Sequence, residues 1–519
     1  MMIEESTQFP ELFFGLVGPI GVDMDAVASK LRAAMVSVGY VPVDIRVTEL
    51  MEQVAVEQAV DDSADPLKRY ESRIKYANAV REKCKNDAAL AALAIQDIRD
   101  KRLKTHTENG RTPPDGTQLA DLPLFRHAYI IRQFKRREEI DLLRQVYGRK
   151  FVQISANLSQ LDRIKTLSRK IATQNPNYDQ KACEVFANTL VEQDLDERAV
   201  DHGQRVSDVF HMGDVFVDAR NEAAIETTTR RFIDALFGKN SISPTIDEYG
   251  TYIAASAALR SLDTSRQVGA AIFSGQGEVI SLGTNEVPKA GGGTYWTDSD
   301  PPHRDFDEGH DANNTNKKRV LFDTVKRLCD GGFIKSEKPI TDLFKDISTS
   351  SALDDALILD ITEFGRMTHA EMNALTDSAR LGRSTAGATL YCTTFPCHNC
   401  AKHIVAAGIS RVIFIEPYPK SKAIELHYDS ITLERGESNR VLFEHFSGIS
   451  PRRYRDIFEK QKRRNSDGTL REWYENQPIP RIEDKSPYYV LNEPSAILAT
   501  LAEVAAELEV VIEDELAPA

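Results

Sequence analysis

Two short motifs in the second half of the chain combine metal ligands with an acid–base group. The first contains His369 and Glu371 two residues apart, and the second contains Cys397 and Cys400 three residues apart behind a proline. An imidazole and two thiolates are ligands that Zn²⁺ prefers, and three protein ligands leave the fourth tetrahedral position to water. Zn²⁺ lowers the pKa of such a water to about 7, which makes it a nucleophile at neutral pH. The spacing therefore predicts a zinc centre of the catalytic kind.

The types and spacing of these residues also predict separate roles for them. Cys397 and Cys400 share one face of a helix start, where the positive helix end favours thiolates. His369 and Glu371 can both face one ion if they stand at a helix N-terminus. We expect His369, Cys397 and Cys400 to bind the metal and Glu371 to move protons as a general acid–base. The alternative is a closed structural zinc site or a chance cysteine pair, which leaves the glutamate and the proline unexplained.

These motifs need helices and strands that bring them together. Apolar periodicity predicts a βαβ unit with the motifs at two helix starts, preceded by a helix, a β-hairpin and a long insertion at about 289–363. The expected helices are 252–262, 317–329, 369–379 and 397–407, and the expected strands are 268–273, 279–284, 389–394 and 411–415.

The first half of the chain alternates strands with helices, which predicts a parallel sheet. The expected strands are 40–47, 127–133, 151–155, 215–218 and an apolar run that begins at 11, and the expected helices are 24–38, 138–147 and 223–237. A charged, alanine-rich segment at about 55–122 is expected to be a helical insertion that ends in a polar loop. A last apolar-striped helix is expected at 495–508.

The first strand runs into a glycine turn that is similar to a phosphate-binding P-loop but lacks its chemistry. A P-loop has the form G-x-x-x-x-G-K-[ST], in which backbone amides and the lysine hold phosphates. Here the turn contains Gly18 and Gly21, but the second glycine of the pattern, the lysine and the hydroxyl are absent, and Asp23 and Asp25 stand where phosphate charge would lie. We therefore expect a degenerate P-loop, nucleotide-kinase-like domain over 1–243 that does not transfer phosphoryl groups. A structural βα turn and a nucleotide or RNA sensor are the remaining interpretations.

Composition limits the class of protein and its partners. The 519 residues carry a formal net charge of −14, which disfavours a polynucleotide backbone as the general partner. No apolar run is long enough to span a bilayer, and the first ten residues are too polar for a secretory signal, so we expect a cytoplasmic protein. Six scattered cysteines do not indicate a disulfide framework.

The stretch from Ser261 to Arg411 resembles the deoxycytidylate (dCMP) deaminase branch of the cytidine deaminase superfamily, whose zinc enzymes carry the form H-x-E…P-C-x-x-C. The matching pieces are SLDTSRQVGA (261–270), GTNEVP (283–288), HAEMNAL (369–375), GATLYCTTFPCHNCAKHIVAAGI (387–409) and RVIF (411–414). The resemblance implies a cytidine-deaminase-like three-layer α/β/α domain over 244–450, Zn²⁺ as cofactor and a deoxycytidine nucleotide as substrate. It also assigns Asn285 to the nucleoside and makes Arg266 and Gln267 further candidates for substrate binding.

Nearly the whole chain resembles the bacterial anti-phage dCTP deaminases, which join a degenerate kinase-like half to a deaminase half. RHAYIIRQFKRREEIDLLRQVYG (126–148) and HGQRVSDVFHMGDVFVD (202–218) carry the likeness into the first half, and 451–519 is then a C-terminal extension. The resemblance implies depletion of dCTP or dCMP in antiviral defence, a small regulatory RNA as partner and a homo-oligomer. The alternatives are housekeeping dCMP deamination, deamination of a polynucleotide, and an RNA-bound regulatory protein with a structural zinc.

Three further features have a functional and a plain interpretation. The basic runs 135–137 and 452–464 are either contacts for phosphates or RNA, or solvated helix faces. His303 and His310 in the long insertion are either ligands of a phosphate or second metal, or loop residues. Trp296 is a candidate lid over the base.

Overall fold

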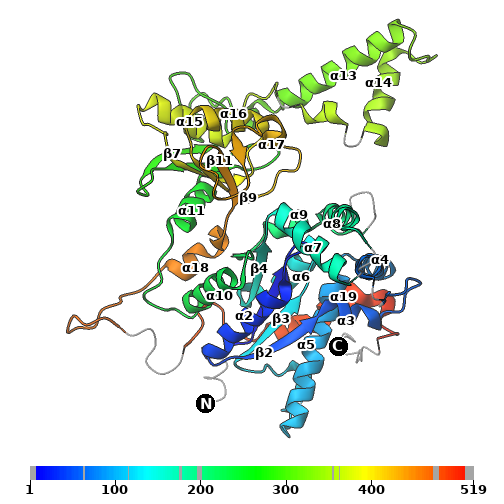
Figure 1. Ribbon diagram of the computed structural model, residues 1–519, viewed down its shortest axis with the longest axis vertical. Helices are drawn as coiled ribbons and strands as arrows, with labels where there is room; N and C mark the ends of the chain where they lie inside the picture. Colours follow the sequence, from blue (N-terminus) through cyan, green and yellow to red (C-terminus); the bar gives the residue numbers. More distant parts are fainter. Residues whose placement is uncertain are drawn as a thin grey trace, which may run out of the picture. The chain divides into compact units, whose positions relative to one another are not determined.

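The computed structural model divides the chain into two compact units. It describes residues 8–61, 63, 65–114, 116–174, 178–195, 202–353, 356–361, 363–471 and 478–508. The first unit is Met1–Tyr249 together with His445–Ala519, and the second unit is Gly250–Glu444. Each unit is built around its own six-stranded sheet (Figure 1), so the predicted α/β class is confirmed. The described part of 451–519, which we expected as an extension, belongs to the first unit.

The sheet of the first unit has the strand order β12-β5-β4-β1-β3-β2. Its strands are β1 (Leu12–Val17), β2 (Val41–Arg46), β3 (His127–Arg132), β4 (Phe151–Asn157), β5 (Val215–Asp218) and β12 (Gly448–Ile449). The first five run parallel, and the short β12 pairs antiparallel with β5. Strand β1 is buried along its whole length, as an inner strand of a parallel sheet covered on both faces must be.

Helices cover both faces of this sheet because alternate residues of β1 point to opposite sides. The helices of this unit are α2 (Met24–Ser37), α3 (Val47–Leu50), α4 (Pro66–Cys84), α5 (Ala89–Glu108), α6 (Arg137–Tyr147), α7 (Gln160–Gln174), α8 (Gln180–Leu195), α9 (Val206–Phe210), α10 (Glu222–Leu236), α18 (Tyr454–Phe458) and α19 (Tyr489–Leu501). Leu12 and Leu16 share a core cluster with side chains of α2 and α10. On the other face, Phe13 stacks on Tyr147 of α6 with 3.6 Å between ring centres and meets Tyr489 of α19 at 5.4 Å.

Two helices of the first unit differ by several residues from the bounds predicted from the sequence. Helix α5 continues past the expected start of the polar loop, because Arg102 in its second half is fully buried and bonded to Glu493 of α19. Helix α19 includes Pro494, after which the predicted helix began, and it ends at Leu501. Proline usually interrupts helices, and the predicted helix therefore started at 495 instead of at Tyr489.

The sheet of the second unit has the strand order β10-β11-β9-β8-β6-β7. Its strands are β6 (Gly269–Phe273), β7 (Val279–Thr284), β8 (Thr389–Thr394), β9 (Arg411–Glu416), β10 (Ile431–Thr432) and β11 (Val441–His445). Strand β6 runs antiparallel to both β7 and β8, whereas β8 and β9 are parallel. Strands β7 and β8 have the bounds predicted from the sequence.

Helices also lie on both faces of the second sheet (Figure 1). They include α11 (Ile246–Ala258), α15 (Ala370–Arg380), α16 (His398–Ala406) and α17 (Ala423–Leu426). Ala270 of β6 shares a core cluster with Ala374 of α15 and Ala401 of α16. The preceding Gly269 faces α11, where a Cβ atom would lie 2.0 Å from the carbonyl oxygen of Ala254. Helices α15 and α16 therefore cover one face and α11 covers the other.

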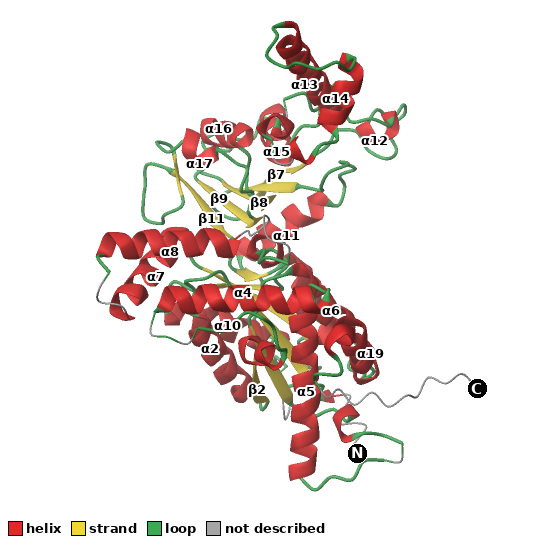
Figure 2. Ribbon diagram, turned by 90° about the vertical axis from the view of Figure 1, so that its right-hand side faces the viewer, coloured by secondary structure: helices red, strands yellow, loops and turns green. Residues whose placement is uncertain are grey.

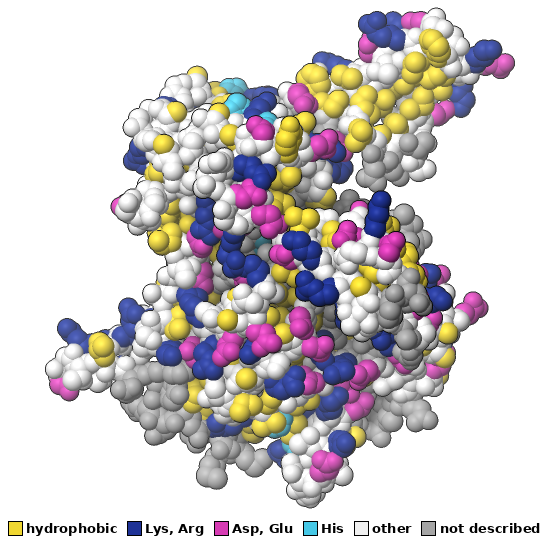
Figure 3. All heavy atoms as spheres, viewed as in Figure 1, with side chains coloured by type: hydrophobic (Ala, Val, Ile, Leu, Met, Phe, Trp, Pro, Cys, Tyr) yellow, Lys and Arg dark blue, Asp and Glu magenta, His cyan; other side chains and the backbone are white. Residues whose placement is uncertain are grey.

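The long insertion contains more helix than the sequence predicted. Its helices are α12 (Asp305–Glu308), α13 (Ala312–Asp330) and α14 (Ile340–Ser348), drawn in Figure 2. Asp311 starts α13 early by accepting hydrogen bonds from the N–H groups of Asn313 and Asn314, at 2.8 and 3.1 Å. The unpredicted α14 packs on α13 through Phe344 and Phe322, and Figure 3 shows apolar side chains along both helices. Of the helices that the structure describes, none is long and apolar enough to cross a membrane.

Candidate active site and metal centre

Three side chains from the two predicted motifs meet at one point. The Nδ1 atom of His369 lies 3.4 Å from Sγ of Cys397 and 3.3 Å from Sγ of Cys400. All three ligand atoms lie within 4.8 Å of one another, and within the described residues no other group of three His, Cys, Asp or Glu side chains is placed to hold a metal. One imidazole nitrogen and two sulfurs at such separations form a donor set that fits Zn²⁺.

The three residues of this metal cluster stand at the N-termini of two helices. His369 is the N-cap of α15 and Cys397 is the N-cap of α16, and neither side chain caps its own helix. Cys400 lies in the first turn of α16 and is buried. Because the N-terminal end of a helix is positive, it favours the thiolate forms that a metal requires. The two helix starts therefore leave these side chains free to face one ion.

Hydrogen bonds inside the metal cluster shift the pKa values of two members in opposite directions. The hydrogen bond from the Cys400 thiol is the largest effect on Cys397 and lowers its pKa. Burial raises this pKa, the hydrogen bond with His369 lowers it, and the resulting pKa of Cys397 is about 4. The hydrogen bond with Cys397 raises the pKa of His369 to about 9. In the metal-free cluster a thiolate therefore lies beside an imidazolium at neutral pH, and metal binding must release protons.

Glu371 lies beside the metal cluster without being part of it. Its side chain is buried in the first turn of α15, and its Oε2 atom lies 3.6 Å from Sγ of Cys400. Burial raises the pKa of Glu371 above the usual value of a carboxyl. A buried carboxyl whose pKa moves toward neutrality, next to a metal-binding group, is suited to accept and return protons.

Contacts that we did not predict hold α15 on β7 and so fix where His369 stands. Gly283 of β7 lets the helix approach, since a Cβ atom there would lie 1.9 Å from the carbonyl oxygen of Ala370. The buried Asn373 accepts a hydrogen bond from the N–H of Thr284 at 3.1 Å, and Ser281 donates one to the carbonyl of Ala374 at 2.8 Å. The glycine of GTNEVP and the asparagine of HAEMNAL were the available signals, although spacing alone assigns them no partner.

The loop after β7 also binds the residue before His369. Glu286 and Thr368 exchange backbone hydrogen bonds at 3.3 and 3.1 Å. The buried Glu286 carboxylate accepts from the N–H groups of Leu262 at 3.3 Å and Val287 at 2.8 Å. The start of α15 is thus held from the strand and from the loop that follows it.

Asn285 and Gln267, two predicted substrate residues, have their side chains bonded to the backbone. Asn285 is buried, accepts a hydrogen bond from the N–H of Val268 at 2.7 Å and donates one to the carbonyl of Arg266 at 2.8 Å. Gln267 donates to the carbonyl of Ser261 at 2.8 Å. Both side chains therefore shape the loop that leads into β6.

Arg266, the third predicted substrate residue, has its side chain half exposed. Its guanidinium pairs with Glu416 at 3.1 Å and lies 5.7 Å from the ring centre of Tyr418. Burial raises the pKa of Tyr418, and the negative charge of Cys397 raises it further. This tyrosine therefore lies within electrostatic range of the metal cluster. The sequence analysis did not single out Tyr418, which no motif marks.

The residues singled out in the long insertion are bonded within it or beside it. Trp296 is half exposed and stacks on Arg260, with 3.6 Å from the guanidinium carbon to the ring centre. His303 bonds to the carboxylate of Glu308 at 2.7 Å, and His310 bonds to the backbone carbonyl of the same residue at 3.2 Å. Neither histidine belongs to the group of possible metal ligands.

The predicted glycine turn lies in the first unit, between β1 and α2. The carbonyl of Gly18 accepts hydrogen bonds from the side chains of Gln133 and Lys135, the latter at 3.0 Å. Gly21 has a φ of +94°, and a Cβ atom there would lie 2.9 Å from Cβ of Arg163. Both backbone conformation and space therefore require glycine at position 21.

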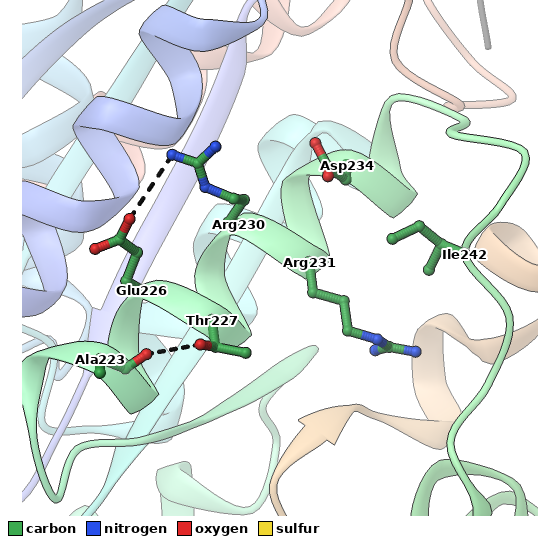
Figure 4. A pocket seen from close by; sticks show the side chains of 7 residues that line it. All are labelled: Ala223, Glu226, Thr227, Arg230, Arg231, Asp234 and Ile242. Atoms are coloured by element: carbon green, nitrogen blue, oxygen red, sulfur yellow. Dashed lines mark hydrogen bonds and ion pairs between the residues drawn. The ribbon is translucent and has the colours of Figure 1, made fainter. Parts of the chain in front are cut away.

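A hollow on the surface of α10, also in the first unit, is drawn in Figure 4. It is lined by Ala223, Glu226, Thr227, Arg230, Arg231, Asp234 and Ile242. Arg231 bonds to Glu248 at 2.5 and 2.8 Å, and Arg230 lies 3.7 Å from Glu226. Because these arginines already have partners, the hollow offers little free charge to a ligand.

Comparison with known proteins relates the second unit to a family. Residues 244–416 match the model of the cytidine and deoxycytidylate deaminase zinc-binding region. Deoxycytidylate deaminase of Enterobacteria phage T2 is 48% identical over 54 residues, which are 10% of this chain and 29% of that protein. ComE operon protein 2 of Bacillus subtilis (strain 168) is 30% identical over 93 residues, which are 18% of this chain and 49% of that protein. The chain thus spans less than half the length of these curated relatives.

A solved structure is also similar to part of the chain. The dCMP deaminase of cyanophage S-TIM5 in complex with dCMP and dUMP is 19% identical, with a TM-score of 0.23, over 40% of this chain and 99% of that chain.

The matched family region contains all three members of the metal cluster and Glu371, and it is a zinc-binding region, so the cofactor is Zn²⁺. The C-terminal region of this chain therefore carries a domain of the cytidine and deoxycytidylate deaminase superfamily.

Proposed function

We propose that the chain hydrolyses the exocyclic amine of a deoxycytidine nucleotide, converting dCTP or dCMP to dUTP or dUMP and ammonia. The observation that carries this proposal is the approach of His369 Nδ1 to both cysteine sulfurs within 3.4 Å, next to the buried carboxyl of Glu371. The similarity to proteins named deoxycytidylate deaminases supports a deoxycytidine nucleotide as the substrate class.

In this mechanism His369, Cys397 and Cys400 would hold the metal through Nδ1 and two Sγ atoms. Zn²⁺, when bound there, supplies Lewis-acid activation of a water molecule at neutral pH. An oxygen of Glu371 accepts a proton from the attacking water and passes it to N3 of the base as the new C–O bond forms at C4. The same carboxylate then takes the remaining proton from the new C4 hydroxyl and delivers it to the amine, so the C4–N bond breaks, the C4 carbonyl forms and ammonia leaves. Burial keeps bulk water away from Glu371 and adjusts its pKa for both transfers.

We assign Arg266 to the nucleotide because it is the half-exposed cation of the loop before β6. Asn285 and Gln267 support it, since Asn285 binds the carbonyl of Arg266 and Gln267 binds that of Ser261 at the beginning of the same loop. Tyr418, under the Arg266 guanidinium, offers a flat surface beside the cluster. The substrate end of the proposed site therefore comprises Arg266, with Asn285 and Gln267 as its supports.

The wider role that we propose is depletion of the dCTP pool in antiviral defence. The resemblance of 126–148 and 202–218 to the anti-phage dCTP deaminases supports this role, together with a degenerate P-loop domain over 1–243. A cytoplasmic location, a small regulatory RNA and a homo-oligomer stay predictions from the same resemblance. Housekeeping dCMP deamination remains the alternative function.

A product profile tests the activity directly. Purified protein with Zn²⁺ is incubated separately with dCTP, dCMP, cytidine and a cytosine-containing oligonucleotide, and ammonia and uracil products are measured. We expect turnover of dCTP or dCMP and none in the Glu371→Ala variant. Reaction of the oligonucleotide alone contradicts the proposal, and absence of any reaction with zinc bound favours a regulatory role.

A further inference from the structure

Helices α13 and α14 of the long insertion form a hairpin whose apolar core is incomplete. Each helix carries apolar side chains at the spacing of one helical face. They are Leu321, Val325 and Leu328 on α13, and Ile340, Leu343, Phe344 and Ile347 on α14. Of these only Leu321 and Val325 are buried, although Phe322 packs on Phe344 with 5.3 Å between ring centres. Two helices alone therefore leave the apolar face of α14 partly open to solvent.

The apolar side chains continue at the closed end of the hairpin, where they are most exposed. Phe333, in the turn that joins the two helices, is 82% exposed, and Leu328 at the end of α13 is 38% exposed. The N–H of Phe333 donates to the carbonyl of Leu328 at 2.9 Å, so the two residues lie together. All residues from 320 to 347 are described, and Figure 3 shows apolar side chains gathered along this part of the insertion. We call Leu328, Phe333 and the apolar face of α14 the hairpin surface, and a gathered apolar patch of this kind marks an interaction site.

The two helices of the hairpin differ in charge, which favours one occupant of its surface. Helix α13 carries five basic and two acidic side chains, whereas α14 carries one basic and two acidic side chains. If α13 of one copy packs on α14 of another copy, unlike charges meet twice, because each copy offers both helices. Packing of α13 on α13 would bring like charges together. The acidic α14 also disfavours an anionic lipid surface as the occupant.

The size of the hairpin limits how firmly a partner can be held. Helix α13 has 19 residues and α14 has nine. A helix rises about 1.5 Å per residue and packed helices lie about 8–10 Å apart, so the hairpin presents a face of at most roughly 500 Å². Two such faces bury about 1,000 Å², which is below the area of most stable complexes and typical of weak, transient ones. We therefore expect a reversible association that depends on concentration.

We propose that the hairpin surface binds a second copy of this chain, so that the α13–α14 hairpins of two copies form a four-helix bundle. Helix α13 of each copy packs on α14 of the other, and the four helices enclose one apolar core. This pairing requires a two-fold axis along the helices, which brings both closed ends to the same end of the bundle. Leu328 and Phe333 then become buried. The contact belongs to the insertion and is additional to any assembly of the deaminase core, so the proposal does not depend on the deaminase activity.

Sedimentation velocity of the full-length zinc protein measures the association. We expect the mean mass of the wild type to double as the concentration rises through the micromolar range. Phe333→Asp places a carboxylate in the paired core, so association should weaken by about ten-fold for each of the two phenylalanines lost. The matched control is Leu491→Asp, which changes a leucine that is 67% exposed on α19 and should associate as the wild type does. Zinc content and thermal unfolding report whether each variant is folded.

Cys329 supplies a second measurement that reports on this surface alone. It lies next to Leu328 in α13 and is partly exposed, and the other partly exposed cysteine, Cys397, is a predicted metal ligand. In the proposed bundle the two copies of Cys329 lie at one level. A short bismaleimide should therefore join them in the wild type and in Leu491→Asp, but not in Phe333→Asp or Cys329→Ser.

Two results would overturn the proposal. The first is equal mass and equal cross-linking in the wild type and Phe333→Asp, which would make the hairpin surface irrelevant to association. The second is binding to vesicles that contain phosphatidylserine, lost in Phe333→Asp, without any rise in mass. That result would make a lipid surface the occupant of the hairpin.

Discussion

The two units place buried polar groups in opposite ways. In the second unit, His369 contacts Cys397 and Cys400, and Cys400 contacts Glu371; among the described residues no other cationic side chain is hydrogen-bonded to the sulfurs. In the first unit, buried charges meet opposite charges, as Arg102 does with Glu493 at 2.5 and 2.8 Å.

This difference separates a ligand site from a framework. Charges that are neutralised within the fold are already satisfied, and their removal damages stability. In the metal cluster, by contrast, the thiolate and the imidazolium that neutralise each other are both metal ligands, and three such ligand atoms at one point are the signature of a metal site.

The largest effect is expected from removal of a ligand of the metal cluster. Cys397→Ser should abolish both zinc content and deaminase activity, because the remaining imidazole and single thiolate cannot complete the donor set. Metal analysis and the ammonia assay measure the two losses. Cys329→Ser, a change of a partly exposed cysteine in α13, is the control and should keep both. Retention of stoichiometric zinc in Cys397→Ser would show that Cys397 is not a metal ligand, and the contrast between a metal site in the second unit and paired charges in the first would no longer hold.

Replacement of the proton-transfer group should separate metal binding from chemistry. Glu371→Gln keeps the shape and burial of the side chain but cannot shuttle protons, so kcat should fall by about 10²- to 10⁴-fold. Zinc content should stay at the wild-type value because the carboxyl is not in the ligand group. Asp377→Asn, at a partly exposed position of the same helix, should change neither. Loss of zinc in Glu371→Gln would mean that this carboxylate is a ligand.

Removal of a buried charge from the first unit should lower the free energy of unfolding. Arg102→Met leaves the buried carboxylates of Glu11 and Glu493 without their shared cation, so the free energy of unfolding should fall by about 3–5 kcal/mol. Denaturant unfolding followed by circular dichroism measures this loss. Lys85→Met breaks the exposed pair with Glu503 and should cost less than about 1 kcal/mol. Similar losses for the two variants would show that burial does not distinguish these pairs.

A smaller loss is expected where α15 is held on β7. Asn373→Ala leaves the buried N–H of Thr284 without its acceptor, which costs about 1–3 kcal/mol in the free energy of unfolding. The start of α15 should also shift, so zinc affinity should fall with it. The matched change Thr376→Ala, on the exposed face of the same helix, should alter neither quantity. Unchanged zinc affinity in Asn373→Ala would show that the helix start is held by other contacts.

The sequence predicted the metal cluster well because each half of it is a local pattern. His369 and Glu371 lie within one helix start and Cys397 and Cys400 within another, and the intervening β8 was predicted with its observed bounds. Zn²⁺ as cofactor is confirmed by the matched zinc-binding region. The α/β class followed from periodicity in the same way.

What the sequence did not predict depends on contacts between distant residues. The N–H of Ile20 donates a hydrogen bond to Asp194, but the two residues are 174 positions apart, and no spacing rule joins them. The contact of Asn285 with the nucleoside stays a prediction, but the sequence did not predict the hydrogen bonds of its side chain to the backbone at 266 and 268. Helix α14 was not predicted from the sequence. None of its residues is buried, so its apolar residues do not form part of the core of this unit.

The smallest expected effect concerns the protons that the metal-free cluster holds. The pKa of His369 is raised to about 9, and the pKa of Cys400 is raised well above that of a free thiol by its hydrogen bond to Cys397 and by burial. At pH 7 both groups therefore hold protons that must leave before they can bind Zn²⁺, whereas Cys397 is already a thiolate. Zinc affinity should accordingly rise with pH between 6 and 9, roughly in line with the release of these protons.

Zinc added to chelator-stripped protein in a weakly buffered indicator solution measures the protons released. At pH 7 we expect release from both His369 and Cys400, with less release near pH 9, where the imidazolium begins to lose its proton unaided. Cys400→Ser leaves one imidazole and one thiolate, so, like Cys397→Ser, it should take up no zinc and release neither proton. The framework pairs of the first unit supply the contrast, because Arg102 keeps its proton across this range and Arg102→Met should leave the proton count unchanged. Zinc uptake without proton release would show that both sulfurs are already thiolates and the imidazole already neutral before the metal arrives, which contradicts the thiolate–imidazolium pair.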